Sequence, residues 1–296
     1  LIVISFMMHR RSFIQSSIGF SLIFPSFVEA ADLPFLDQIG LQLYTLRKPI
    51  SEDLGRTLKE VSSIGYKQVE PYGFPSPEAL EIIKKARDLG MSVHSTHFAW
   101  DSLLHPEKKN QPTFEKIIEL AEKLEITDLV IPYIHKVDRS DLSAYERTAE
   151  TLNQGAILSK EAGIRLAYHN HAFEFKPLAF GKTGYDVFVE SFSPEMFFEV
   201  DVFWVKVGGI DPIAQLKKLK GRVSQVHLKD LSKRVHCPNF GKMSPDDFEE
   251  IGDGQIPMTP IIKTAKACGV KHCHIEQDHS PDPIASIHKS LRHLKK

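Results

Sequence analysis

From residue 38 onward, short apolar runs alternate with longer stretches whose apolar positions recur at helical spacing. Runs of this kind predict buried strands and amphipathic helices in regular alternation. The expected strands cover residues 38–46, 67–72, 92–98, 128–134, 165–171, 196–203, 223–229 and 271–277. The expected helices cover residues 52–64, 76–89, 112–124, 141–162, 185–191, 211–220, 257–268 and 283–294. The pattern therefore consists of strand-then-helix units repeated along the chain.

This repetition predicts a single α/β domain over residues 31–296, a (β/α)8 TIM barrel. Glycines such as Gly65, Gly90 and Gly163 precede strands, as expected where a helix ends in a left-handed cap. A doubly wound open sheet is the main alternative, but no glycine-rich phosphate-binding fingerprint follows the first strand. The segment 231–255 is long for a connection and rich in Pro, Gly and Asp, so we expect an active-site loop or lid.

Polar residues collect at the carboxyl ends of the expected strands. The densest group lies in RLAYHNHAFEF, where His169 and His171 are two positions apart and so face the same way in a strand. The other strand ends carry Gln42, Tyr44, Glu70, Tyr72, His94, His97, Asp201, His227, Lys229, His274 and Glu276. Because a TIM barrel gathers the carboxyl ends of its strands at one mouth, these residues predict a shared site.

Four of these residues, His169, Asp201, His227 and Glu276, have the chemistry of a metal cage. Two imidazoles and two carboxylates suit Mn²⁺, Zn²⁺, Co²⁺ or Fe²⁺ better than Ca²⁺, and the lack of Cys here argues against a structural zinc site. For any one histidine, a structural role explains the residue equally well. Four such residues at equivalent strand ends favour one bound divalent ion, which could polarise a carbonyl and stabilise an enediolate.

The motifs GLQLYTLR, YKQVEPYGF, SVHSTHF, LAYHNHAFEF, FEVDVFWV, VHLKD and HIEQD resemble the sugar phosphate isomerase/epimerase family of xylose isomerase-like TIM barrels, including exported members. The resemblance runs from about Gly40 to the end of the chain. It implies one divalent ion held by Glu, Asp, His and Glu on strands five to eight, and the last three correspond to Asp201, His227 and Glu276. At the first position this chain has His169, which we expect to be the ligand, with Glu174 as an alternative ligand or a base.

This departure from the family pattern bears on the mechanism. Epimerases of the superfamily use two metal-bound glutamates on opposite faces of the sugar, one removing and one returning a proton. With His169 in the first place, we expect a single base, which is Glu276, Glu174 or His171. Lys229 would neutralise the developing oxyanion.

The resemblance also suggests how a sugar would be held. Tyr44, Glu70 and His97 would bind its hydroxyl groups. Trp100 would stack on the sugar ring, although packing at the rim explains this residue equally well.

Together these features predict a divalent-metal-dependent isomerase or epimerase that converts a sugar or keto-sugar through an enediolate. The alternative is a 3-keto-glycoside lyase or hydrolase that cleaves by β-elimination next to a metal-polarised ketone, as exported relatives imply. Two less favoured functions are an apurinic endonuclease, which needs several metals and a basic groove, and a non-catalytic sugar-binding protein. The expected partner is a small-molecule carbohydrate, and pairing of helix faces into a homo-oligomer stays open.

Composition and charge narrow these alternatives. The chain has 296 residues, of which 42% are hydrophobic and 25% charged, as in a soluble globular enzyme. A formal net charge of −1 gives no overall attraction to nucleic acid, so we expect no nucleic-acid partner. The three cysteines are an odd number and predict no disulfide framework.

Residues 1–30 are expected to form an export signal, with the residues before Met7 read as upstream translation. Arg10 and Arg11 precede an uncharged apolar region, 16–28, that is too short for a permanent membrane anchor. Ala30 and Ala31 provide the small residues that signal peptidase requires. Paired arginines resemble a twin-arginine signal, which predicts a periplasmic or secreted protein.

Overall fold

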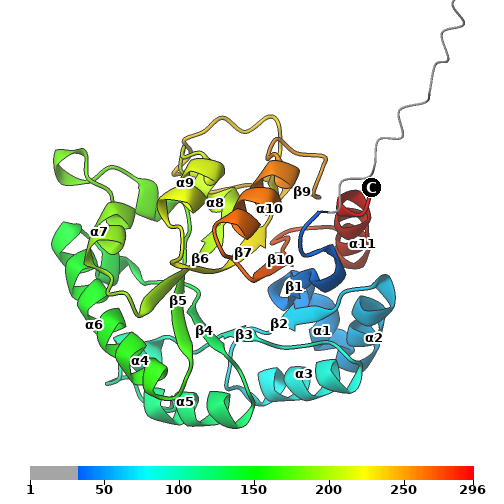
Figure 1. Ribbon diagram of the computed structural model, residues 1–296, viewed down its shortest axis with the longest axis horizontal. Helices are drawn as coiled ribbons and strands as arrows, with labels where there is room; N and C mark the ends of the chain where they lie inside the picture. The colour runs from blue at the N-terminus through cyan, green and yellow to red at the C-terminus, as the bar shows by residue number, and fades with distance from the viewer. Residues whose placement is uncertain (1–32) are drawn as a thin grey trace, which may run out of the picture. The chain divides into compact units, whose positions relative to one another are not determined.

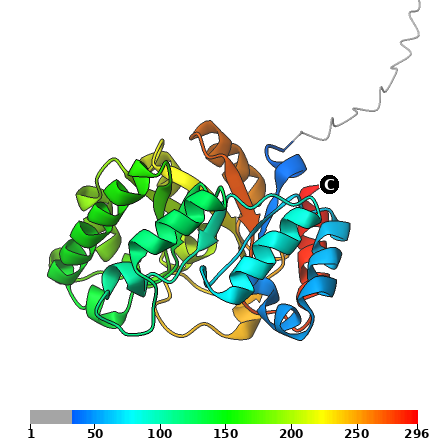
Figure 2. The same ribbon diagram turned by 90° about the horizontal axis from the view of Figure 1, so that it is seen from below.

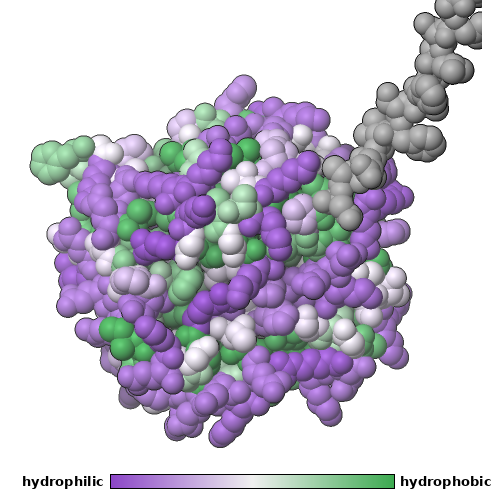
Figure 3. Space-filling model, in the orientation of Figure 1, coloured by the Kyte–Doolittle hydropathy of each residue, from purple (hydrophilic) through white to green (hydrophobic). Residues whose placement is uncertain are grey.

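The computed structural model describes residues 33–296, which lie in one compact unit. The expected export signal, residues 1–30, lies outside the described residues and stays a prediction. Within the described part, every helix is too short or too polar to cross a bilayer. Polar side chains predominate on the face shown in Figure 3, where apolar residues form small scattered groups.

Parallel strands form the centre of the fold and confirm the predicted (β/α)8 barrel (Figure 1). They are β1 (Gly40–Gln42), β2 (Gln68–Glu70), β3 (Ser95–His97), β4 (Asp128–Ile131), β5 (Arg165–His169), β6 (Met196–Asp201), β7 (Val223–Leu228) and β10 (His272–Ile275). Their order is β2-β1-β10-β7-β6-β5-β4-β3. The two end strands meet through single bridges, Gln68 with Ser92 and Phe74 with Phe98, so the barrel is nearly closed.

Helices between the strands surround this barrel. The main ones are α2 (Leu54–Ile64), α3 (Pro77–Asp88), α5 (Phe114–Lys123), α6 (Leu142–Glu161), α7 (Gly184–Ser191), α9 (Pro212–Lys218), α10 (Met258–Ala267) and α11 (Pro283–Leu294). Polar side chains begin many of them; Asp141, for example, accepts the Ala144 N–H at the start of α6. The last helix, α11, packs against α2, which brings the two ends of the barrel domain together (Figures 1 and 2).

All eight strands end earlier than predicted, and three of these ends bear on the site. At β1, the Gln42 side chain accepts the Tyr44 N–H and begins the 3-10 helix η2 (Leu43–Leu46). At β6, the Asp201 carboxylate accepts the Trp204 N–H and begins the short helix α8 (Val202–Val207). Strand β5 ends at His169, so His171 lies beyond it. Two other short helices, α1 (Arg47–Glu52) and α4 (Asp101–Leu104), were also not predicted.

The apolar core lies between the sheet and the helices, whereas the inside of the barrel holds buried polar side chains. The Glu70 carboxylate accepts hydrogen bonds from Gln42 Nε2 (2.8 Å), Ser95 Oγ (2.5 Å) and Gln225 Nε2 (2.5 Å). Gly40 makes room for the His274 ring, because a Cβ at position 40 would come within 2.2 Å of it. Buried polar groups that are paired in this way fix the layer beneath the mouth.

The segment 231–255 contains a small antiparallel pair, β8 (Asp230–Leu231) and β9 (Phe248–Glu249), where a loop was expected. Asp230 closes the segment at its base. Its carboxylate accepts four backbone hydrogen bonds of 2.8–3.1 Å, from the N–H groups of Leu231, Gly252, Gly254 and Ile256.

Candidate active site

The four residues predicted to bind a metal come together at the mouth of the barrel. His169 ends β5, Asp201 ends β6, His227 pairs in register with Asp201 from β7, and Glu276 follows β10. All four are buried, and each offers a ligand atom within 4.8 Å of those of the other three. We call these four residues the quartet. The strands that carry them are neighbours in the sheet, which explains why distant segments meet.

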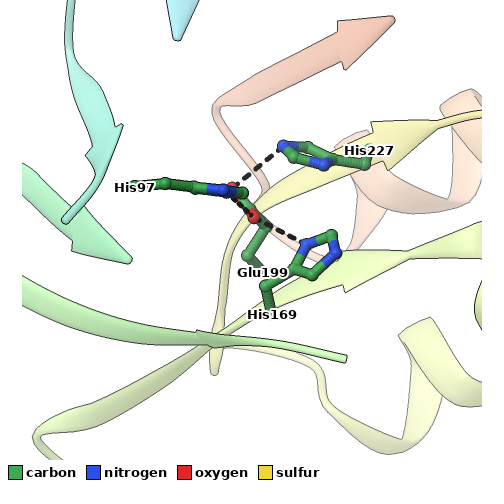
Figure 4. Close-up of side chains that lie close together, drawn as sticks. All are labelled: His97, His169, Glu199 and His227. Atoms are coloured by element: carbon green, nitrogen blue, oxygen red, sulfur yellow. Dashed lines mark hydrogen bonds and ion pairs between the residues drawn. The ribbon is translucent and has the colours of Figure 1, made fainter. Parts of the chain in front are cut away.

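Glu199, in β6 two positions before Asp201, contacts three imidazoles with its carboxylate (Figure 4). Its Oε2 lies 2.8 Å from His97 Nε2 and 2.8 Å from His169 Nδ1, and its Oε1 lies 3.1 Å from His227 Nε2. A carboxylate accepts hydrogen bonds, so His97 Nε2 and His169 Nδ1 donate to Glu199, whereas His227 Nε2 faces it as an ion-pair partner. Glu199 therefore sets the tautomer of His169 and the orientation of both quartet histidines.

The other ring nitrogens of these two histidines face the carboxylates of the quartet. His169 Nε2 lies 3.9 Å from Asp201 Oδ2, and His227 Nδ1 lies 3.1 Å from Glu276 Oε2. A carboxylate that orients a histidine from behind is the usual support of a metal ligand. The quartet thus presents two imidazole nitrogens and two carboxylates to one small space.

The buried ammonium of Lys229 lies against the acidic side of this space. Its Nζ is 2.8 Å from Glu276 Oε2, 2.8 Å from Asp278 Oδ1 and 3.2 Å from Asp201 Oδ2. Burial opposes the charge, but these carboxylates raise the pKa of Lys229 well above its ordinary value. Burial likewise opposes ionisation of Glu276, but Lys229 and His227 hold the pKa of that carboxyl well below its usual range. Both groups are therefore charged at neutral pH.

Two histidines at the centre of the barrel bind protons strongly. Burial would lower the pKa of His97, but Glu199 and Glu70 outweigh it and raise that pKa to about 9. Burial also opposes the charge of His227, but Glu199 and Glu276 raise its pKa well above the ordinary value. The surplus of buried carboxylates thus attracts positive charge to this region.

The quartet fits a divalent ion. Asp201 Oδ2 is buried and accepts no hydrogen bond, and among the described residues its ion-pair partners are His169 Nε2 at 3.9 Å and Lys229 Nζ at 3.2 Å, so lone-pair density stays available for a metal ion. The mixed nitrogen and oxygen donors suit Mn²⁺, Zn²⁺, Co²⁺ or Fe²⁺. Two further buried groups overlap the quartet and contain Glu199 or Glu70 as the acid. Those two carboxylates already hold ring nitrogens by hydrogen bonds or ion pairs, so we favour the quartet.

A cavity of about 620 Å³ adjoins the quartet and is lined by His169 and Glu276. Five more predicted site residues lie on its walls: Tyr44, His97, Trp100, His171 and Lys229. Its walls also include Trp204 and Asp278, together with three residues that the sequence did not point to: Arg47, Tyr133 and His279. Arg47 donates a 2.8 Å hydrogen bond to the Asp278 carbonyl oxygen, and both residues belong to the motifs GLQLYTLR and HIEQD.

Two of the quartet, Asp201 and His227, lie behind the wall of this cavity and do not line it, and neither do the predicted site residues Glu70 and Glu174. Glu70 lies in the polar layer beneath it. Glu174 lies in the 3-10 helix η4 (Phe173–Phe175), where its carboxylate accepts the Tyr168 O–H (2.5 Å) and the His171 N–H (2.9 Å). Burial raises the pKa of Glu174 to about 8. The structure therefore brings His169, and not Glu174, into the quartet.

The chain belongs to the xylose isomerase-like TIM barrel family, whose model matches residues 58–296. This membership confirms the resemblance found in the sequence and the prediction of an enzyme of that family.

Among curated proteins, the chain is 26% identical over 231 residues to an inosose dehydratase of Clostridium perfringens (strain 13 / Type A), covering 70% of this chain and 75% of that one.

Solved structures share the fold. A sugar phosphate isomerase/epimerase from Parabacteroides distasonis ATCC 8503 is 24% identical, with a TM-score of 0.67, and the match covers 88% of this chain and 98% of that one. The IOLI protein, solved with a bound zinc atom, is 14% identical, with a TM-score of 0.60, covering 87% and 95% of the two chains.

Proposed function

We propose that the protein is a divalent-metal-dependent enzyme that removes the proton next to the carbonyl of a keto-sugar and expels the group β to that carbonyl. The family and the curated relative, a dehydratase, support chemistry on sugars, either isomerisation or epimerisation or the dehydration of a keto-sugar, and the buried quartet supports a metal ion. Elimination is the member of this class that best matches the arrangement of acidic groups around the cavity.

The observation that carries the proposal is that the carboxylates of the cavity wall lie on one side. Among the described residues that line the cavity, Glu276 and Asp278 are the acidic ones, and both contact the same ammonium, Lys229 Nζ, at 2.8 Å. The strand-five position, where the family pattern has a second glutamate, holds His169. Exchange of a proton between two carboxylates on opposite faces of a sugar therefore lacks its second base, whereas elimination needs one base.

The residues of the wall can carry out this elimination. The Glu276 carboxylate takes the proton from the carbon next to the carbonyl, and the C–H electron pair forms a carbon–carbon double bond as charge moves to the carbonyl oxygen. The Lys229 ammonium stabilises that oxygen. When the carbonyl forms again, the bond from the β carbon to its oxygen substituent breaks, and the departing oxygen receives the proton from Glu276. A divalent ion in the quartet would supply Lewis acidity toward the carbonyl oxygen.

His171 is placed to assist the departing group. Its Nδ1 is buried and makes no hydrogen bond, and the residue lines the cavity. A substrate oxygen at this wall would meet that nitrogen. Aldose–ketose isomerisation is the second candidate, because the same single base can return its proton to the neighbouring carbon.

Incubation with Mn²⁺ or Zn²⁺ and a panel of 3-keto-glycosides, inososes and aldoses in deuterium oxide tests the proposal. We expect an alcohol or water to be released together with an enone, and Glu276→Gln to abolish the release. Uptake of deuterium without release would favour isomerisation instead. If no sugar releases an alcohol or water and none takes up deuterium, both elimination and isomerisation are overturned.

A further inference from the structure

A second cavity, of about 320 Å³, adjoins the first and shares part of its wall. The shared residues are Tyr133, His171, Trp204, Asp278 and His279. The remaining wall consists of Ala172, Phe173, Phe240, Gly241, Met243 and Phe248. Phe240 and Met243 belong to the segment 231–255, so this segment contributes to a binding wall.

The residues that belong to the second cavity alone are apolar. Phe248 stacks on Phe203 with ring centroids 4.6 Å apart and lies edge-on to Trp204 at 6.0 Å. Phe173 stacks on His171 at 5.3 Å. Flat, packed rings of this kind favour another flat apolar group, whereas sugar hydroxyl groups would lose their hydrogen bonds there.

The boundary between the two cavities carries polar groups. His171 lines both cavities, and its buried Nδ1 has no hydrogen-bond partner. A buried imidazole nitrogen of this kind calls for a ligand atom. The oxygen that joins a sugar to its substituent would lie at such a boundary, with the sugar beside the quartet and the substituent against the phenylalanines.

We propose that the second cavity binds the apolar, ring-bearing substituent of a keto-glycoside whose sugar occupies the first cavity. This inference rests on the proposed elimination and names its substrate class: the departing group is an alcohol or phenol that carries a ring, rather than water. The first cavity fixes the reacting carbons, and the second selects the substituent.

Kinetics with two substrates of matched leaving-group acidity test the inference. Benzyl and methyl 3-keto-glucosides both release an alcohol, so a difference between them reports the ring. We expect kcat/KM to be at least tenfold higher for the benzyl compound, with most of the difference in KM. Met243→Ala and Phe240→Ala should each reduce this preference at least threefold, whereas Phe180→Ala, on an exposed side chain, should leave the preference and both rates unchanged. Equal kcat/KM values for the two compounds would overturn the inference.

Binding of unreactive glycosides separates the inference from the proposed reaction. Both tryptophans of the chain, Trp100 and Trp204, line the first cavity, so their fluorescence can report occupancy. We expect benzyl glucoside to bind at least fivefold more tightly than methyl glucoside, and Met243→Ala to remove the difference. If the protein prefers benzyl glucoside but eliminates no substrate, ring binding in the second cavity is supported and the proposed reaction is refuted. Elimination without a benzyl preference would refute the second cavity alone.

Discussion

At the scale of single residues, Glu199 does more to define the site than any group on the cavity wall. It is fully buried, and its two oxygens hold ring nitrogens of His97, His169 and His227. Through these contacts Glu199 engages the inner ring nitrogens and turns the outer nitrogens of His169 and His227 toward the quartet carboxylates. An amide in its place could donate to a ring and turn the tautomer the wrong way.

We therefore expect Glu199→Gln to weaken divalent-metal binding about 10- to 100-fold. Titration of metal-depleted protein by calorimetry, at constant pH, measures the dissociation constant directly and does not depend on activity. Glu190→Gln, whose side chain is 62% exposed, is the matched control and should bind metal like the wild type. A dissociation constant within twofold of the wild type for a folded Glu199→Gln protein would contradict the role of Glu199.

The contrast between His169 and Glu174 shows what a sequence can predict at this scale. Alternation along β5 correctly places His169 at the mouth of the barrel. Glu174 comes after the strand has ended, inside η4, where alternation no longer applies and Tyr168 captures its carboxylate. The contact of Glu199 with His97, which is 102 positions earlier, depends on closure of the barrel and has no local signal. Metal binding by the quartet itself stays a prediction.

At the scale of elements, the segment 231–255 depends on one buried carboxylate. Asp230 accepts N–H groups from both ends of the segment, so it ties the start of the segment to its return toward α10. The approach is close, since a Cβ at Gly254 would lie 2.2 Å from Asp230 Oδ1. Without the Asp230 carboxylate, the β8–β9 pair would lose its anchor, and Phe240 and Met243 would no longer be held in place.

We expect Asp230→Asn to lower the free energy of unfolding by about 2–4 kcal/mol, because an amide leaves N–H groups unpaired and places its own donors against them. Urea denaturation measures this change, and limited proteolysis should show new cleavage within residues 232–247. Asp246→Asn, in the same segment with a side chain that is 80% exposed, should stay within about 0.5 kcal/mol of the wild type. Equal stability of the two variants would argue against the anchor.

The sequence pattern predicted the elements unequally. Helices such as α3 and α11 were predicted closely, since their apolar spacing agrees with proline and capping residues at their first turns. Helix α8 was missed because VFWVKV continues the apolar run of β6, and only the hydrogen bond from the Trp204 N–H to Asp201 shows where the strand stops. The β8–β9 pair was missed because two-residue strands have no period to detect.

At the scale of the whole molecule, closure of the barrel concentrates negative charge at its centre. The carboxylates of Glu70, Glu199, Asp201, Glu276 and Asp278 are contributed by three separate parts of the chain and surround Lys229 and the histidines. Near-neutral total charge gives no sign of this concentration. A divalent ion and protons on the imidazoles are two ways to compensate the same buried charge, so they should compete.

Metal ions and protons compete for His227, so metal affinity should rise with pH. The carboxylates around His227 outweigh burial and raise its pKa well above the ordinary value. In the apo protein this ring therefore carries protons on both nitrogens at neutral pH. Coordination needs the Nδ1 lone pair, and binding must therefore release the Nδ1 proton. Below the raised pKa, the metal dissociation constant should fall up to tenfold for each unit of increasing pH. Calorimetry at pH 6, 7 and 8, in buffers of different ionisation enthalpy, measures both the affinity and the protons released. His288→Gln, on α11 and away from the cavity, should show the same slope, whereas an affinity independent of pH would place the metal on groups other than His227.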